Sequence, residues 1–226
     1  MDGVTFRTKY DIRAHTIEFT EHYVALYKFG VNPIPENWNR SEADVAIRYF
    51  LDLELNPSDF NDNDVIDIGC GPGFFKKTIL RIGSPKTYIN LDINPFLENL
   101  DIIADAARMP FKDNSFDLVL SFGSIAGVRW NDFQTRSYLC VNPLDSLWEV
   151  ARILRSGGVA KIGPISLLRS CWKNENDGVK YESVRHEFFN FATLLKEKFP
   201  CLEIEFYRII DSGTGRFDEW MTFRKQ

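Results

Sequence analysis

Residues 65–75 read VIDIGCGPGFF, an apolar run that leads into a turn with three glycines. Glycine tolerates positive φ and lets a ligand approach the main chain, and a helix that starts at such a turn aims amide groups at the ligand. Asp67 precedes the first glycine by two residues, and its carboxylate would repel a pyrophosphate by on the order of a kcal/mol. The turn therefore favours a cationic ligand. Alternatively, Asp67 only accepts amide hydrogen bonds from its own loop.

A second acidic residue, Asp92, lies near the end of the apolar run TYINLDI at residues 87–93. An acid there can accept hydrogen bonds from both hydroxyls of a ribose, although Asp-Ile-Asn-Pro is also a sequence that caps turns. S-adenosylmethionine suits both carboxylates, because it has a ribose and a cationic amino group and no phosphate. A nicotinamide dehydrogenase is disfavoured, because the dinucleotide fingerprint GxGxxG places its third glycine one residue later.

Strands and helices alternate in the segment that must position these residues. The pattern predicts a mostly parallel sheet with covered faces and a ligand site at the carboxyl ends of its strands. Two alternating runs near the C-terminus, with a glycine-containing turn between them, predict an antiparallel hairpin at the sheet edge. The predicted strands are 65–68, 87–93, 101–105, 116–122, 159–165, 201–210 and 216–225, and the predicted helices are 74–82, 144–154 and 184–198.

The N-terminal part has a different pattern. Apolar residues recur at helical spacing over residues 13–29 and again after Ser41, with the loop NPIPENWN between them. We therefore expect residues 1–60 to form an N-terminal helical extension that acts as a lid, and residues 61–226 to form the domain that it covers.

Composition narrows the class of partner. Lys and Arg number 27 against 32 Asp and Glu, so the net charge of −5 makes nucleic acid an unfavoured partner, although a local basic patch stays open. The four cysteines form no CxxC pair, and carboxylates and histidines do not cluster, so we expect free thiols and no metal. The sequence has no apolar signal core and no run of about 18 apolar residues. A cytoplasmic protein without membrane contact is expected.

Four segments in order resemble the motifs of the class I S-adenosylmethionine-dependent methyltransferases. They read VIDIGCGPG, YINLDI, DIIADAARMPFKDNSFDLVLSF and LWEVARILRSGG, and they are similar to the branch with DxGCGxG, DAxxLPFxDxSFDxV and ExxRVLKPGG. The resemblance covers roughly residues 60–166. It implies an α/β fold, Rossmann-like and doubly wound, with a mostly parallel sheet and a reversed last strand, and S-adenosyl-L-methionine as cofactor.

The resemblance also implies a cofactor site at four successive strand ends, made by Asp67, Gly69, Cys70, Gly71, Asp92, Ile93, Asp105, Ala106, Ser121 and Phe122. Asp67, Gly69, Cys70 and Gly71 match the loop around the methionine part of the donor, and Asp92 matches the ribose ligand. Ile93, Asp105 and Ala106 match the contacts to the adenine, and Ser121 and Phe122 match the methyl-transfer face. Asp105 could instead be an ordinary acid at a strand end. Because only twelve residues separate Asp92 from Asp105, we expect a turn or very short coil where relatives have a helix.

The reaction itself leaves the catalytic residue open. Methyl transfer is an in-line displacement that depends on alignment, and a general base is optional. His186 precedes a predicted helix and could overhang the pocket, or it could simply be exposed at the helix start. A small molecule or a sugar-bearing intermediate is the expected acceptor. The alternatives are an RNA or protein methyltransferase, or a subunit that binds S-adenosylmethionine without catalysis.

Overall fold

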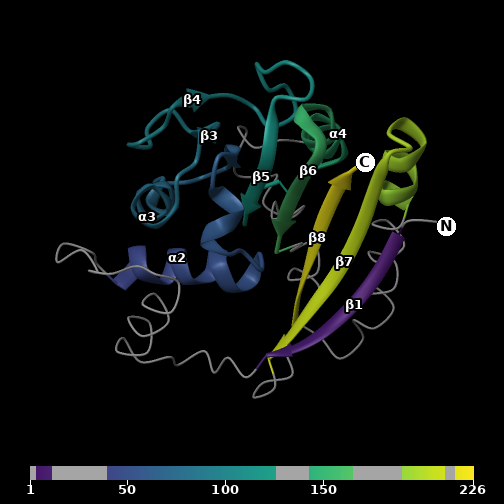
Figure 1. The fold of residues 1–226 in the computed structure, drawn as a ribbon, viewed down its shortest axis with the longest axis horizontal. Coiled ribbons are helices and arrows are strands. Elements are labelled where there is room, and N and C mark those ends of the chain that lie inside the picture. Colours follow the sequence, from purple (N-terminus) through teal and green to yellow (C-terminus); the bar gives the residue numbers. More distant parts are fainter. Residues whose placement is uncertain (1–3, 12–39, 126–142, 165–189, 212–216) are drawn as a thin grey trace, which may run out of the picture.

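The protein is seen in a computed structural model that describes residues 4–11, 40–125, 143–164, 190–211 and 217–226. These residues form one mixed sheet of eight strands in the order β1-β7-β8-β6-β5-β2-β3-β4 (Figure 1). The strands are β1 (Val4–Asp11), β2 (Asp64–Ile68), β3 (Thr87–Asp92), β4 (Ile102–Ile103), β5 (Phe116–Phe122), β6 (Leu154–Gly163), β7 (Leu202–Asp211) and β8 (Phe217–Lys225). The helices are α2 (Arg40–Asp52), the short 3-10 helix η1 (Pro57–Phe60), α3 (Phe74–Ile82) and α4 (Pro143–Ile153), and residues 190–198 are also helical.

Strands β2 to β6 run parallel, as the alternation of strands and helices predicted. Strand β8 is antiparallel to both β6 and β7, which confirms the C-terminal hairpin. The hairpin does not form the sheet edge, however, because β1 pairs in parallel with β7, with Val4 opposite Ile204. Figure 1 shows β1 as the outermost strand beside β7.

Strand β1 is an element that the expected helical extension did not include. Its sequence VTFRTKYD alternates apolar and polar residues, which is the period of a strand with one covered face. Its partner β7 lies about 200 residues further along the chain. Residues 12–39, which include the predicted helix 13–29, lie outside the described residues.

The boundaries of α4 and β6 also differ from the prediction. The helix ends at Ile153, and β6 begins at Leu154, before the predicted strand start at residue 159. Leu154 pairs with Phe116, and the register then shifts before Leu118 pairs with Val159. The two glycines that were predicted to end the helix therefore lie within an irregular strand. Between β3 and β4 the chain makes only turns, as the short spacing predicted.

Hydrophobic cores lie on both faces of the sheet, as expected for a doubly wound fold. Ile66 and Ile68 of β2 face the core that includes α4, whereas Val65 faces the core that includes α2 and α3. Adjacent strand residues point to opposite faces, so β2 is fully buried on both sides. None of the described helices is long and apolar enough to cross a membrane.

Candidate functional site

Four parallel strands bring the predicted site residues to one edge of the sheet. Strands β5, β2, β3 and β4 are neighbours in that order, so their carboxyl ends lie side by side. The glycine turn follows β2, Asp92 ends β3, Asp105 follows β4, and Ser121 lies near the end of β5. The sequence-predicted residues therefore gather at the place where open α/β sheets bind ligands.

The turn after β2 is held by its backbone and requires glycine. Gly69, Gly71 and Gly73 have φ of +70°, +55° and +70°, in the left-handed region that glycine adopts without a steric penalty. The amides of Gly69 and Cys70 both donate to the Leu91 carbonyl, at 2.7 and 3.2 Å, which ties the turn to β3. A Cβ at Gly71 would meet no atom of the described residues within 4 Å. The backbone at Gly71 therefore borders open space.

Asp92 links the glycine turn to the segment after β3. Its Oδ2 accepts a hydrogen bond from the Gly71 amide at 3.1 Å, and its Oδ1 accepts one from the Asn94 amide at 3.0 Å. The turn cap that the sequence allowed is therefore present. Each carboxylate oxygen has a second lone pair, so the half-buried Asp92 can still accept bonds from a diol.

Asp105 and Ala106 lie beside Asp92, because the amide of Ala104 donates to the Asp92 carbonyl at 3.1 Å. The Asp105 Oδ1 accepts a bond from the Ala107 amide at 2.9 Å, and no other described residue hydrogen-bonds this half-buried carboxylate. Its Oδ2 accepts no bond from the described part of the chain and can accept one from a ligand. Ala106 packs against the core on the α4 side of the sheet.

Asp67 is enclosed by two tyrosines. Its side chain is fully buried, and the Tyr49 hydroxyl of α2 donates to both carboxylate oxygens at 3.1 Å. Burial raises the pKa of Asp67 to about 7, and the charge of Asp92 adds to the rise, whereas the hydroxyls of Tyr49 and Tyr88 oppose it. The buried Tyr88 hydroxyl also lowers the pKa of Asp67, although it forms no hydrogen bond with any described residue.

The carboxyl end of β5 contributes one buried and one half-buried residue. Ser121 is buried, and its Oγ accepts a bond from the Ile125 amide at 3.3 Å. The half-buried Phe122 ring stacks on Tyr49, with a centroid distance of 4.9 Å. The candidate catalytic residue His186 lies outside the described residues.

Comparisons with known proteins indicate the type of domain. Residues 66–162 match the family model of a methyltransferase domain. The matched segment is less than half of the chain, and it agrees with the resemblance of the sequence motifs to class I S-adenosylmethionine-dependent methyltransferases. A fatty-acid O-methyltransferase from Mycolicibacterium smegmatis is 33% identical over 132 residues, which cover 52% of this chain and 44% of that protein. A 25S rRNA (adenine-N(1))-methyltransferase from Chaetomium thermophilum is 29% identical over 89 residues, 37% of this chain and 15% of that protein.

The chain therefore spans less than half the length of either relative. A solved structure with the same fold is that of a candidate S-adenosylmethionine-dependent methyltransferase from Listeria monocytogenes. It aligns with a TM-score of 0.50 at 13% identity, over 78% of this chain and 97% of that one.

Methyltransferases of this family use S-adenosylmethionine, and most of the site fits that molecule. The open backbone at Gly71 leaves space for a ligand, and the carboxylates of Asp92 and Asp105 retain free lone pairs. Asp67 fits less simply, because its carboxylate is fully buried under Tyr49. Donor contact with Asp67 requires the Tyr49 hydroxyl to leave.

Sequence reasoning missed Tyr49 and Tyr88 in the candidate site. Both look like ordinary core aromatics, and Tyr49 does stack on Phe75 at 4.1 Å. The one signal available was that a buried tyrosine hydroxyl needs a partner. Which carboxylate accepts the bond from Tyr49 depends on how α2 packs against the sheet, and a local sequence pattern does not predict this packing.

Proposed function

We propose that this chain transfers a methyl group from S-adenosylmethionine to a small-molecule acceptor, with the donor bound along the carboxyl ends of β2, β3 and β4. The observation that carries the proposal is the bond from the Gly71 amide to Asp92. It places an open glycine backbone directly beside a carboxylate with spare lone pairs. S-adenosylmethionine supplies an activated methyl group on a sulfonium, and the protein supplies alignment and exclusion of water.

In this proposal, different residues contact different parts of the donor. Asp92 accepts bonds from the ribose hydroxyls, and Ile93 lies beside the adenine. The free oxygen of Asp105 accepts a bond from the adenine amino group, which is the polar group that a carboxylate can recognise. Gly69, Cys70 and Gly71 surround the methionine part, and Ser121 and Phe122 border the face where the methyl group leaves.

Asp67 has a conditional role. A cationic amino group can pair with its carboxylate only after the Tyr49 hydroxyl moves away, because Asp67 is fully buried in the structure described. Tyr49 also stacks on Phe122, so its movement would change the methyl-transfer face as well. We infer that α2 covers the methionine end of the donor.

The preference for a small acceptor is supported by charge and by one relative. The chain has a net charge of −5, which gives no broad attraction for a phosphate backbone. The fatty-acid O-methyltransferase acts on a small molecule, as its name says. The rRNA relative keeps RNA as the second candidate acceptor. A cytoplasmic location stays a prediction from the sequence.

An acceptor screen with labelled donor tests the proposal. The purified chain would be incubated with methyl-labelled S-adenosylmethionine and, separately, small carboxylic acids, phenols, amines, glycosides, RNA and a protein extract. We expect label in a small-molecule fraction, and less label with Asp92→Asn. Label in RNA or protein alone would contradict the acceptor class. Donor binding without transfer to any acceptor would favour a non-catalytic subunit.

A further inference from the structure

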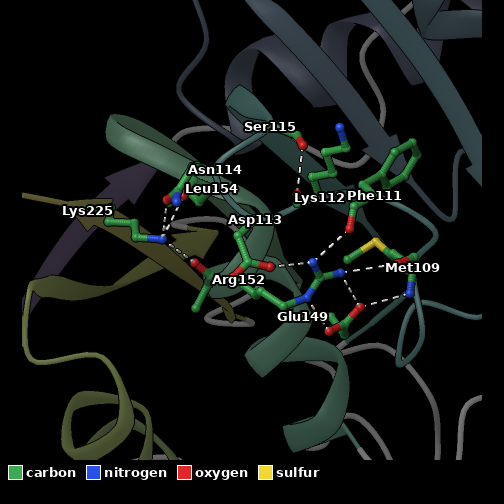
Figure 2. Close-up of polar contacts among 11 residues, drawn as sticks. Met109, Phe111, Lys112, Asp113, Asn114, Ser115, Glu149, Arg152, Leu154 and Lys225 are labelled. Atoms are coloured by element: carbon green, nitrogen blue, oxygen red, sulfur yellow. Dashed lines mark hydrogen bonds and ion pairs between the residues drawn. The ribbon is translucent and has the colours of Figure 1, made fainter.

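Two residues of α4 hold the segment that follows Asp105 (Figure 2). The Glu149 Oε2 accepts a bond from the Met109 amide at 2.9 Å. Arg152, one helical turn later, donates to the Met109 carbonyl at 3.1 Å and to the Phe111 carbonyl at 2.7 Å. Both backbone polar groups of Met109 are therefore bound by the same helix.

The pair is rigid because every Arg152 donor is used. Its Nε and Nη2 bond to the two carboxylate oxygens of Glu149 at 2.7 and 2.8 Å, and its Nη1 bonds to Asp113 at 2.8 Å. Together with the Met109 and Phe111 carbonyls, this engages all five donors of the guanidinium. Such bidentate, charge-assisted contacts fix orientation as well as distance. The bond from Arg152 also keeps the pKa of Glu149 below its usual value, so Glu149 is an anion.

The held segment connects directly to the adenine side of the site. The amide of Ala107 donates to the Asp105 carboxylate, and the amide of Arg108 donates to the Asp105 carbonyl at 2.9 Å. Met109 follows at once, and its side chain is buried in the core. At the other end, the amide before Asp105 donates to the Asp92 carbonyl. Asp105 is thus held between β3 and α4.

We propose that Glu149 and Arg152 are positioning residues that orient the Asp105 carboxylate toward the adenine of the donor. The inference rests on the proposed function, which places the adenine at Asp105. Neither residue touches the donor in this account. They act through Met109, by fixing where the turn that starts at Asp105 must end.

Arg155 provides a matched control on the same stretch of chain. It bonds to both oxygens of Asp117 at 2.6 Å, to Asp64 at 3.2 Å and to the Ser115 carbonyl at 2.9 Å. With a further bond from its Nε to the Asn114 carbonyl at 3.4 Å, these contacts engage the Arg155 guanidinium as fully as that of Arg152. They anchor the far end of the same connection, at the amino ends of β2 and β5, and none reaches Met109. Loss of Arg155 therefore perturbs stability without releasing Asp105.

The test compares two nucleosides in four proteins. The dissociation constants of S-adenosylhomocysteine and of its hypoxanthine analogue would be measured for the wild type, Glu149→Gln, Arg152→Lys and Arg155→Lys, with thermal unfolding of each. Hypoxanthine presents an oxygen where adenine presents an amino group, so a well-oriented Asp105 prefers adenine. We expect Arg152→Lys and Glu149→Gln to reduce that preference roughly tenfold, the effect of losing a hydrogen bond to a charged group.

The Arg155 variant should keep the wild-type preference even if its melting temperature falls. An unchanged preference in both Glu149→Gln and Arg152→Lys would overturn the inference, whatever happens to their stability. An equal loss of preference in Arg155→Lys would also overturn it, because the effect would then be general destabilisation. If the wild type binds neither nucleoside, the proposed function fails, and this inference fails with it. If Arg152→Lys does not fold, the isosteric Glu149→Gln decides.

Discussion

The Tyr49 hydroxyl on α2 lies 3.1 Å from each carboxylate oxygen of Asp67 at the tip of β2. The tyrosine ring is fixed between aromatic neighbours, at 4.1 Å from Phe75 and 4.9 Å from Phe122 between ring centroids. A residue far from the glycine turn in sequence thus covers the acid that precedes it. Access of any cationic ligand to Asp67 is coupled to the position of α2.

Replacement of Tyr49 by phenylalanine tests this coupling. If the donor amino group takes the place of the Tyr49 hydroxyl beside Asp67, the bonds from this hydroxyl stabilise only the ligand-free protein. Its removal should then tighten S-adenosylhomocysteine binding by up to about tenfold, the worth of one hydrogen bond to a charged group. Adenosine, which lacks the amino acid part, should bind Tyr49→Phe and wild type equally. Calorimetric titration of both ligands gives the answer, and weaker or unchanged S-adenosylhomocysteine binding would rule out competition.

The raised pKa of Asp67 predicts a pH-dependent cost to the fold. A carboxyl whose pKa rises from about 3.9 unfolded to about 7 folded binds protons more tightly in the folded state. Stability therefore falls as pH rises from about 4 to 7. Asp67→Asn removes this cost, so it should stabilise the fold more at pH 8 than at pH 5, by up to about 4 kcal/mol at pH 8. Urea unfolding at pH 5 and pH 8 measures the difference. An unchanged free energy of unfolding for Asp67→Asn at pH 8 would contradict the prediction.

The sequence pattern predicted the strands and turns that carry the proposed donor site, whereas the other features depend on how the elements pack. The glycine turn, Asp92 and the strands behind them have local signals, because turn residues and apolar runs are read over a few positions. Strand β1 has the alternation of a strand, but its partner β7 lies at the other end of the chain. The bond from Tyr49 to Asp67 and the role of Arg152 likewise depend on how helices pack, which no short pattern reports.

Alanine variants of two glycines with positive φ distinguish an effect on donor binding from an effect on stability. Gly71 has φ of +55° and Gly157 has φ of +81°, and among the residues that the structure describes, none has an atom within 4 Å of a Cβ at either position. Alanine at each should cost about 1–2 kcal/mol of folding free energy, from the left-handed backbone alone. Gly71→Ala should also weaken S-adenosylhomocysteine binding, because its Cβ enters the space beside Asp92.

Gly157 lies near the amino end of β6, at the opposite end of the sheet from the donor site. Gly157→Ala should therefore bind S-adenosylhomocysteine like the wild type. Thermal unfolding and calorimetric titration of both variants make the comparison. Equal binding by the two variants would mean that the donor does not lie against the glycine turn.

The most direct test of the account is calorimetric titration of S-adenosylhomocysteine into the wild type, Asp92→Asn and Asp62→Asn. Asp62 is exposed near the amino end of β2, with φ of +58°, a conformation that asparagine adopts readily; its variant changes charge away from the site. We predict wild-type affinity for Asp62→Asn and a loss of about tenfold or more for Asp92→Asn. Equal binding by all three proteins, or binding of NADH in place of S-adenosylhomocysteine, would contradict the assignment of this strand edge as the donor site.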